Sequence, residues 1–354
     1  MALDFSNISP WQDIVRCNVA PNGTVSNIGS ATLNNENLRV MVRIPKFWVK
    51  ADAITDGIHS YRWFISSTSQ SGYEVHPAFY QRSAAAPADY IYVGAYETSL
   101  HSGTTTLTSI TGVAPHVNVD IGAMKKLAYT INSDKYWGIT NVWTRNAVEL
   151  LCMNEYGNMD SQSNIGLGIV NAGAASNSGA DSIEGQLNAD GTGTGTGTNG
   201  LTPICYRWME NLWGNVWEFL DGIEAVDANY RILRRDGAWD ETGPSDEAGV
   251  VPYTVWDSGD YEVSTAIPII TDGYIKDVVW EDLLQYLMIP SVIGGSSSTY
   301  IPDYFYAHDS GEANIVLAGG HWNTGAYAGL ASRTAADVVS TAYASFGGRL
   351  EFIP

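Results

Sequence analysis

Apolar residues at every second position predict three β-strands in the first hundred residues. The clearest is a half-buried strand over residues 38–44, which Pro45 ends. Two more strands are predicted over 61–66 and over 89–96, where tyrosines alternate with aliphatic residues. Residues 1–38 are polar and rich in turn signals, so we interpret them as a lead-in segment of short strands and turns.

Helical spacing of apolar residues predicts two short amphipathic helices, near 118–129 and 143–157. Residues 137–141 are expected to form a turn between them, with Asn141 as a candidate N-cap of the second helix. Cys152 falls within the apolar pattern of that helix and is therefore expected to be a buried small hydrophobe.

A glycine-rich stretch separates the two halves of the chain. Residues 166–200 lose all periodicity and end in alternating Gly and Thr over 191–198. Such an alternation offers no useful core face, so it predicts a flexible surface loop. It is not a phosphate-binding loop, because the Gly-Lys-Ser/Thr ending is missing.

The residues around Gly214 and Asn215 predict a turn that stabilises the fold rather than a catalytic site. Gly214 and Asn215 precede Trp217 as in a tight turn that enters a buried strand. Side-chain hydrogen bonds from Asn215 and Glu218 could fix such a turn.

The C-terminal segment, about 319–350, combines a glycine, tryptophan and arginine frame with chemically mixed positions. Trp217 and Trp322 are predicted to be buried core anchors rather than ligand contacts, and Arg349 is interpreted as a further anchor of the frame. The positions between them follow neither a helical period nor a period of two, and small hydroxyl and aromatic side chains on a rigid frame are typical of an adaptable binding surface. The candidate ligand-binding residues are His321, Asn323, Thr324, Tyr327, Thr334, Ala336, Asp337, Ser340, Tyr343 and Ser345.

Composition favours a loop-rich, β-rich globule. Only 16% of the 354 residues are charged, 45% are hydrophobic, and 36 are glycine. The net charge of −20 repels phosphate backbones and anionic membrane surfaces, so we expect no nucleic-acid binding. Calcium binding stays open, with Asp257, Asp260 and Glu262 as candidate ligands, but their spacing does not match a twelve-residue calcium loop.

Cysteine usage and hydropathy exclude several classes of protein. The three cysteines are too few and too far apart for a disulfide framework or a zinc site. The chain has no signal peptide and no apolar run of eighteen residues, so we expect cytoplasmic synthesis without membrane insertion.

Three motifs give the chain a resemblance to a known family. Residues 210–218 (ENLWGNVWE), 237–239 (GAW) and 347–350 (GGRL) resemble the C-type lectin-like fold of formylglycine-generating-enzyme type. More closely, the chain is similar to the variable proteins of diversity-generating retroelements and their phage tail-tip relatives. The resemblance implies an α+β, C-type lectin-like domain over 39–354, with small antiparallel sheets, two flanking helices and a variable region at about 319–350.

The resemblance also implies a function. In such proteins a fixed frame displays residues that vary, so the expected activity is recognition of a protein or glycan ligand on a cell surface. The protein itself would be located on a virion tail tip or on a cell surface. Display in a homo-oligomer is open. No cofactor is expected.

Two alternatives remain. A static virion or surface subunit would use the same frame without a ligand. An enzyme of the formylglycine-generating class is disfavoured, because the resemblance places its activity on cysteines of the C-terminal half, and no cysteine follows Cys205.

Overall fold

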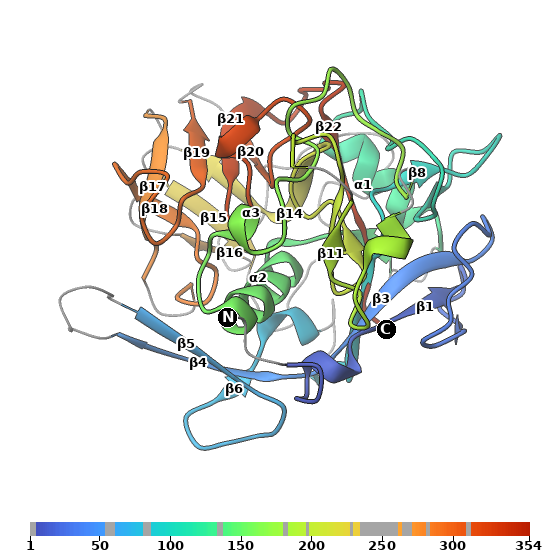
Figure 1. Cartoon of the computed structure of the whole chain (residues 1–354), viewed down its shortest axis with the longest axis horizontal. Coiled ribbons are helices and arrows are strands. Elements are labelled where there is room, and N and C mark those ends of the chain that lie inside the picture. The colour runs from blue at the N-terminus through green and yellow to red at the C-terminus, as the bar shows by residue number, and fades with distance from the viewer. Residues whose placement is uncertain are drawn as a thin grey trace.

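The computed structural model describes residues 5–53, 61–80, 86–132, 137–179, 183–195, 198–226, 229–233, 261–263, 271–280, 284–308 and 313–354. The protein is mostly β, with few helices and with curled, largely antiparallel sheets (Figure 1). Within these ranges the strands form five sheets.

The largest sheet contains most strands of the C-terminal half. Its order is β16-β15-β14-β20-β21-β19-β17-β18, with β22 paired to β14. The β14–β22 and β19–β21 pairs are parallel, and the other pairs are antiparallel. Its strands are β14 (Trp217–Val226), β15 (Asn229–Leu233), β16 (Tyr261–Val263), β17 (Gly273–Val278), β18 (Pro290–Ile293), β19 (Tyr304–Ala307), β20 (Asn314–Ala318), β21 (Arg333–Val338) and β22 (Phe346–Gly347).

A second, antiparallel sheet joins the two ends of the chain in the order β10-β23-β7-β3-β1-β2. Residues 1–38, the predicted lead-in segment, supply β1 and β2 to it. Its strands are β1 (Val15–Val19), β2 (Val25–Ser26), β3 (Arg39–Pro45), β7 (Tyr90–Gly94), β10 (Trp137–Ile139) and β23 (Leu350–Phe352).

Three small sheets complete the β-structure that is described. The β4–β5 hairpin extends from the body of the molecule (Figure 1). The strands are β4 (Trp48–Ala53), β5 (Tyr61–Ser66) and β6 (Glu74–Val75); β8 (Ser99–Leu100) and β9 (Leu107–Thr108); and β11 (Gly193–Thr194), β12 (Ile204–Tyr206) and β13 (Met209–Glu210).

Both predicted helices are confirmed, as α1 (Ile121–Tyr129) and α2 (Val142–Tyr156). Asn141 caps α2 as predicted, since its Oδ1 accepts hydrogen bonds from the backbone N–H groups of Trp143 and Thr144 at 2.8 and 3.0 Å. Cys152 is buried in α2, as predicted. The other described helices are short: α3 (Ser161–Asn164) and the 3₁₀ turns η1 (Trp11–Asp13), η2 (Pro77–Phe79), η3 (Ile183–Gln186) and η4 (Gly325–Tyr327).

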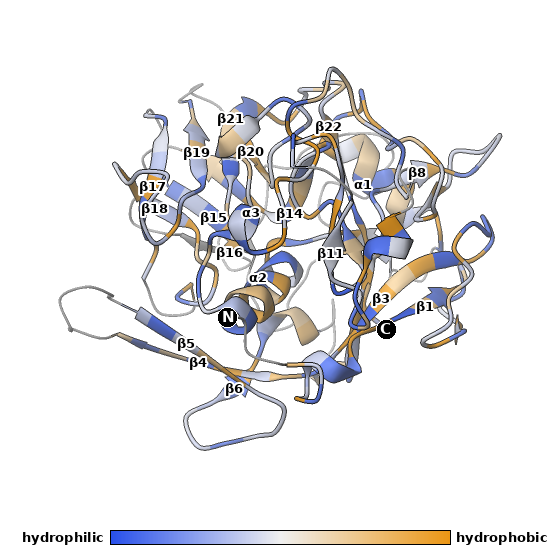
Figure 2. Cartoon of the chain, viewed as in Figure 1, coloured by the Kyte–Doolittle hydropathy of each residue, from blue (hydrophilic) through white to orange (hydrophobic). Residues whose placement is uncertain are grey.

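The strands predicted over 38–44, 61–66 and 89–96 are confirmed as β3, β5 and β7. However, β3 is not half-buried. Met41 is fully buried, like Val40 and Val42 on the opposite face, because the sheet is covered on both sides. Figure 2 accordingly shows β3 in mainly hydrophobic colours.

Two predictions about loops are wrong. Residues 137–139 form β10, which pairs with β23 at the C-terminus, so only Thr140 and Asn141 connect it to α2. The Gly-Thr stretch contains β11, which pairs with β12, and a Cβ at Gly191 would lie 2.1 Å from the Trp208 ring. Close packing against an aromatic ring explains a glycine there.

Candidate functional site

A chain of buried ion pairs fixes the C-terminal frame. It consists of Arg349, Glu218, Arg145, Glu149 and Arg333, each at most 4% exposed, and we call it the arginine–glutamate ladder. Its residues come from α2, β14, β21 and the segment before β23. Buried charges need partners with good geometry, so the ladder specifies how these elements meet.

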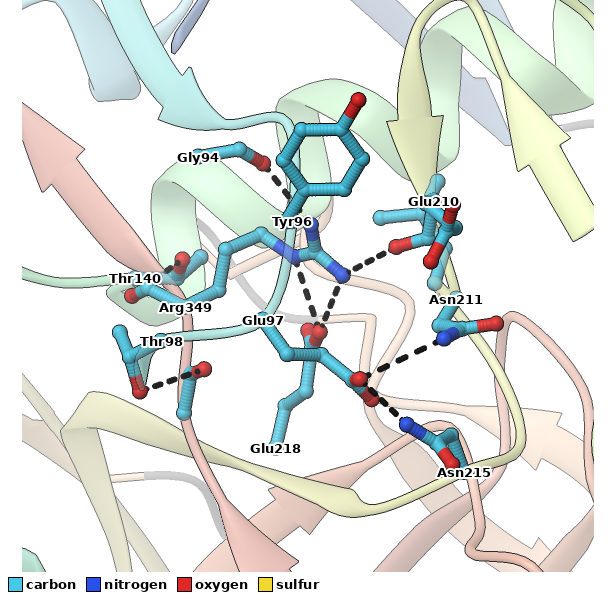
Figure 3. A network of polar contacts seen from close by, with 12 residues as sticks. Gly94, Tyr96, Glu97, Thr98, Thr140, Glu210, Asn211, Asn215, Glu218 and Arg349 are labelled. Atoms are coloured by element: carbon cyan, nitrogen blue, oxygen red, sulfur yellow. Dashed lines mark hydrogen bonds and ion pairs between the residues drawn. The ribbon is translucent and has the colours of Figure 1, made fainter. Parts of the chain in front are cut away.

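Arg349 uses its whole guanidinium group (Figure 3). Its Nε and Nη2 donate to Glu218 Oε1 at 2.8 and 2.5 Å. Its Nη1 donates to the carbonyl of Gly94 at 2.8 Å, and Nη2 also donates to the carbonyl of Glu210 at 2.5 Å. The predicted anchor role of Arg349 therefore has a physical basis in four contacts with three segments.

Arg145 and Arg333 extend the ladder from Glu218 to the start of β21. Arg145 Nη1 approaches Glu218 Oε2 at 3.4 Å, and its Nε donates to Glu149 Oε1 at 2.9 Å. Arg333 donates to the same Glu149 oxygen and, at 3.0 Å, to the carbonyl of Leu330. The ladder thus holds both flanks of residues 334–348, while the segment between them is free of this restraint.

Gly214 and Asn215 form the tight structural turn that the sequence predicts. Both residues have left-handed backbone, with φ values of 80° and 62°, and a Cβ at Gly214 would lie 2.7 Å from the carbonyl oxygen of Ile169. The Asn215 side chain donates to Glu97 Oε2 at 2.5 Å and accepts from the backbone N–H of Ser176 at 2.7 Å. Its carbonyl accepts from the N–H of Trp322 at 3.0 Å, which ties this turn to the C-terminal segment.

The two predicted tryptophan anchors differ. Trp217 is 6% exposed, in agreement with the prediction. Trp322 is only half-buried, so the expectation that it is a core anchor is wrong. Its backbone carries the anchoring instead, because its carbonyl also accepts from the N–H of Ala172 at 2.7 Å.

Four tyrosines gather on the outer side of the largest sheet, next to the C-terminal segment. We call Tyr274, Tyr304, Tyr306 and Tyr327 the tyrosine patch. The Tyr304 ring lies 4.5 Å from that of Tyr327, 4.8 Å from Tyr306 and 5.3 Å from Tyr274 (centroid distances). Tyr327 is 42% exposed and the other three are half-buried.

Strand alternation explains how the patch forms. Phe305 points into the core with no exposed surface, so Tyr304 and Tyr306 on either side of it face outward. Tyr274 of β17 is paired with Tyr304 of β19, and η4 brings Tyr327 above them. Sequence reasoning selected only Tyr327. The Tyr-Phe-Tyr alternation at 304–306 was the available signal for two of the other three.

Trp217 lies between the tyrosine patch and the residues near exposed Tyr343. Its ring lies 6.0 Å from that of Tyr306 and 6.4 Å from the imidazole of His321. Its strand pairs with Phe346, whose ring lies 5.1 Å from that of Tyr343. Tyr343 is 54% exposed. In Figure 1 the labelled strands β19, β21 and β22 lie along the same upper side of the molecule.

The predicted ligand-binding positions divide into three groups by exposure. Thr324 and Thr334 are buried, at 7% and 4% exposed, so the expectation that they face solvent is wrong. Thr324 Oγ1 accepts from the N–H of His321 at 2.8 Å inside a turn, and Thr334 lies in β21 between two neighbouring strands. The half-buried positions are His321, Ala336, Asp337 and Ser345, and the exposed ones are Asn323, Tyr327, Ser340 and Tyr343.

Comparison with known proteins gives no family assignment. No protein-family model and no curated protein matches the chain. Among solved structures, one that resembles it is titled "Major Tropism Determinant U1 Variant". It is 12% identical, with a TM-score of 0.32, and the match covers 96% of this chain and 72% of that one.

The described residues include no group of three or more His, Cys, Asp or Glu side chains that could hold a metal ion. Burial raises the pKa of the Cys17 thiol to about 12, and burial likewise raises the pKa of Cys152 and Cys205. Thiols with raised pKa values are poor nucleophiles. Asp257, Asp260 and the GAW motif at 237–239 lie outside the described residues. No helix within the described ranges is long and apolar enough to cross a membrane.

Glu97 is a buried acid next to the ladder, and it carries a prediction about pH. Burial, and then the nearby Glu218 carboxylate, raise the pKa of Glu97 from 4.5 to about 8. In the folded state its carboxyl group is therefore protonated at neutral pH, whereas in the unfolded state it is ionised. Its contribution to stability is complete below pH 4.5 and is lost as the pH rises through about 8.

Glu97→Gln should remove this pH dependence and raise the melting temperature at pH 8. A glutamine oxygen can still accept from Asn215 and Asn211, whose Nδ2 atoms lie 2.5 and 3.3 Å from Glu97 Oε2. The measurement is the difference in melting temperature between variant and wild type from pH 5 to 9. The exposed Asp89→Asn serves as control and should show no such trend. A difference for Glu97→Gln that is equally flat would contradict a protonated carboxyl in the folded protein.

Proposed function

We propose that this protein is a ligand-binding display protein whose C-terminal surface recognises a molecule on a cell surface, without catalysis. The observation that carries the proposal is a rigid, buried ladder that holds the C-terminal segment, together with a partly exposed aromatic patch that includes Tyr327 of this segment. The four clustered tyrosines offer aromatic contact area with polar tips, and Asn323, Ser340 and Tyr343 are further exposed residues of the C-terminal segment. Aromatic anchors of this kind carry most of the energy in protein interfaces.

The finer assignments are part of the same proposal. A C-type lectin-like fold accords with small curled sheets that flank two helices and with the chain ends brought together in one sheet. Location on a virion tail tip, and variation of the segment at about 319–350, would follow from the family resemblance of the sequence motifs.

Substitutions at exposed and at buried positions of the C-terminal segment should change the free energy of unfolding by different amounts. Alanine at Asn323, Ser340 or Tyr343 should change the free energy of unfolding by no more than about 0.5 kcal/mol, because these side chains lie outside the core. Thr324→Ala should cost about 1 kcal/mol, since it removes a hydrogen bond inside a turn. Urea denaturation of each variant measures both effects.

The binding test uses a library randomised at Asn323, Tyr327, Ser340 and Tyr343, with Thr324 and Thr334 kept fixed. Folding is scored by cooperative melting, and binding by capture on a panel of whole bacterial cells. We expect most variants to fold and to differ in the cells that they bind. If most fold but all bind alike, or none binds, the protein is a static subunit. If most fail to fold, the segment is core and the proposal is wrong.

A further inference from the structure

The tyrosine patch has the geometry of a site for a cation. Its rings meet at interplanar angles of 37°, 53°, 68°, 79° and 80°, so they present faces that are tilted toward different directions rather than a flat platform. The face of each ring is the negative pole of its quadrupole, and an ammonium or guanidinium group within about 6 Å of such a ring is attracted to it. Sugars, in contrast, stack on one flat ring at a time.

The charges around the patch favour a cation. Asp272 is exposed, and its Oδ1 accepts from the N–H of Ala307 at 2.7 Å, which places the carboxylate at the end of β19 beyond Tyr306. Burial, followed by this carboxylate, raises the pKa of Tyr304, so its hydroxyl stays neutral. Burial also lowers the pKa of His321, which removes its positive charge at neutral pH.

One exposed cation lies on the same strand as Tyr274. Lys276 follows it by two residues on β17 and is exposed. Its flexible stem lets the ammonium group move away into water at low cost, so it competes only weakly for the rings. The net charge of −20 attracts cationic partners over a longer range and repels anionic ones.

We propose, building on the display function above, that the tyrosine patch is a subsite for an arginine or lysine side chain of a protein ligand. The guanidinium or ammonium group lies over the faces of Tyr304 and Tyr327, and the Asp272 carboxylate pairs with it at the rim. This selects a protein rather than a glycan as the molecule that the surface recognises.

The test uses a fluorescein-labelled peptide of alternating glycine and arginine, and the same peptide with citrulline in place of arginine. Citrulline has the shape of arginine without its charge. Fluorescence anisotropy with the full-length protein should show tighter binding of the arginine peptide. Tyr327→Leu should weaken that binding by about threefold to tenfold, since it removes a ring face, while Tyr327→Phe should retain it. Asp272→Asn should also weaken it, and Lys276→Gln should not.

Three outcomes would overturn the inference. Equal binding of both peptides would exclude recognition of the charge. Unchanged binding of the arginine peptide by the folded Tyr327→Leu variant would show attraction to the acidic surface in general. Binding of methyl glycosides that depends on Tyr327, without binding of the arginine peptide, would assign the patch to a glycan and likewise refute the inference.

These results are separable from the fate of the proposed function. If capture of cells depends on Tyr327 but the peptides do not bind, the display function stands and the cation subsite is wrong. If the arginine peptide binds through Tyr327 but no cell is captured by any library member, the subsite stands and the display function is wrong.

Discussion

Replacing Arg349 by methionine should destabilise the protein by about 3–5 kcal/mol, because it leaves the buried Glu218 carboxylate with only the 3.4 Å contact to Arg145. Glu218 would lose two hydrogen bonds, at 2.8 and 2.5 Å, and the carbonyls of Gly94 and Glu210 would each lose a donor. Glu97 lies in the same network, but its carboxyl group is protonated at neutral pH, so Glu218 is the carboxylate whose charge Arg349 offsets. Chemical denaturation monitored by tryptophan fluorescence measures the loss.

Two further variants distinguish the ladder from simple packing. Arg349→Lys keeps the charge but cannot reproduce four contacts in fixed directions, so it should rescue only a part of the loss. Arg349→Met combined with Glu218→Gln should be less harmful than the sum of the single changes, since the second removes the carboxylate charge that Arg349 no longer offsets. Lys126→Met, at an exposed position of α1, is the control and should have little effect. If Arg349→Met matched this control, the ladder would not hold the frame.

Sequence patterns located the elements whose signals are local. Both long helices and strands β3, β5 and β7 follow from periodicity over five to fifteen residues, which nearby side chains alone determine. The Gly-Thr stretch shows where this fails. Its order comes from pairing with β12 and from the Trp208 ring, and neither contact is encoded within the stretch itself.

The arginine–glutamate ladder could not be predicted from the sequence either. Arg145 and Glu149 stand four residues apart on α2, a spacing that normally indicates an exposed ion pair on a helix surface. They are 1% exposed because α2 is covered by the largest sheet on one side and by other strands around it, and the partners Glu218 and Arg333 arrive from distant segments. Only the assembled fold shows that the charges are buried.

The candidate binding site was predicted in part. The C-terminal segment and the exposure of Tyr327 and Tyr343 follow from composition, since small and aromatic residues among glycines are typical of displayed loops. Thr324 and Thr334 were misplaced because hydroxyl residues serve equally well inside turns and central strands. Tyr274, Tyr304 and Tyr306 were missed because pairing of β17 with β19 brings them to Tyr327 from a distance in sequence.

Trp217→Ala should lower the free energy of unfolding by about 3–5 kcal/mol and should also abolish ligand capture. We therefore expect Trp217 to support both the stability of the protein and its binding surface. Its indole is 6% exposed at the start of β14, and its backbone N–H donates to the carbonyl of Ser345 at 2.8 Å. Because the ring lies edge-to-face against Tyr306 at 6.0 Å, its loss removes the side chain that packs against this member of the tyrosine patch.

Trp217→Phe should restore most of the stability, since it refills part of the cavity, and should partly restore capture of cells. Trp322→Ala is the matched comparison. Its side chain is half-buried, so we expect a distinctly smaller loss of melting temperature than for Trp217→Ala. Thermal melts and cell capture are measured on the same preparations. Equal melting temperatures for the two alanine variants would show that burial of Trp217 does not support the frame. A folded Trp217→Ala protein with full capture would show that binding does not depend on the packing of Trp217 against Tyr306.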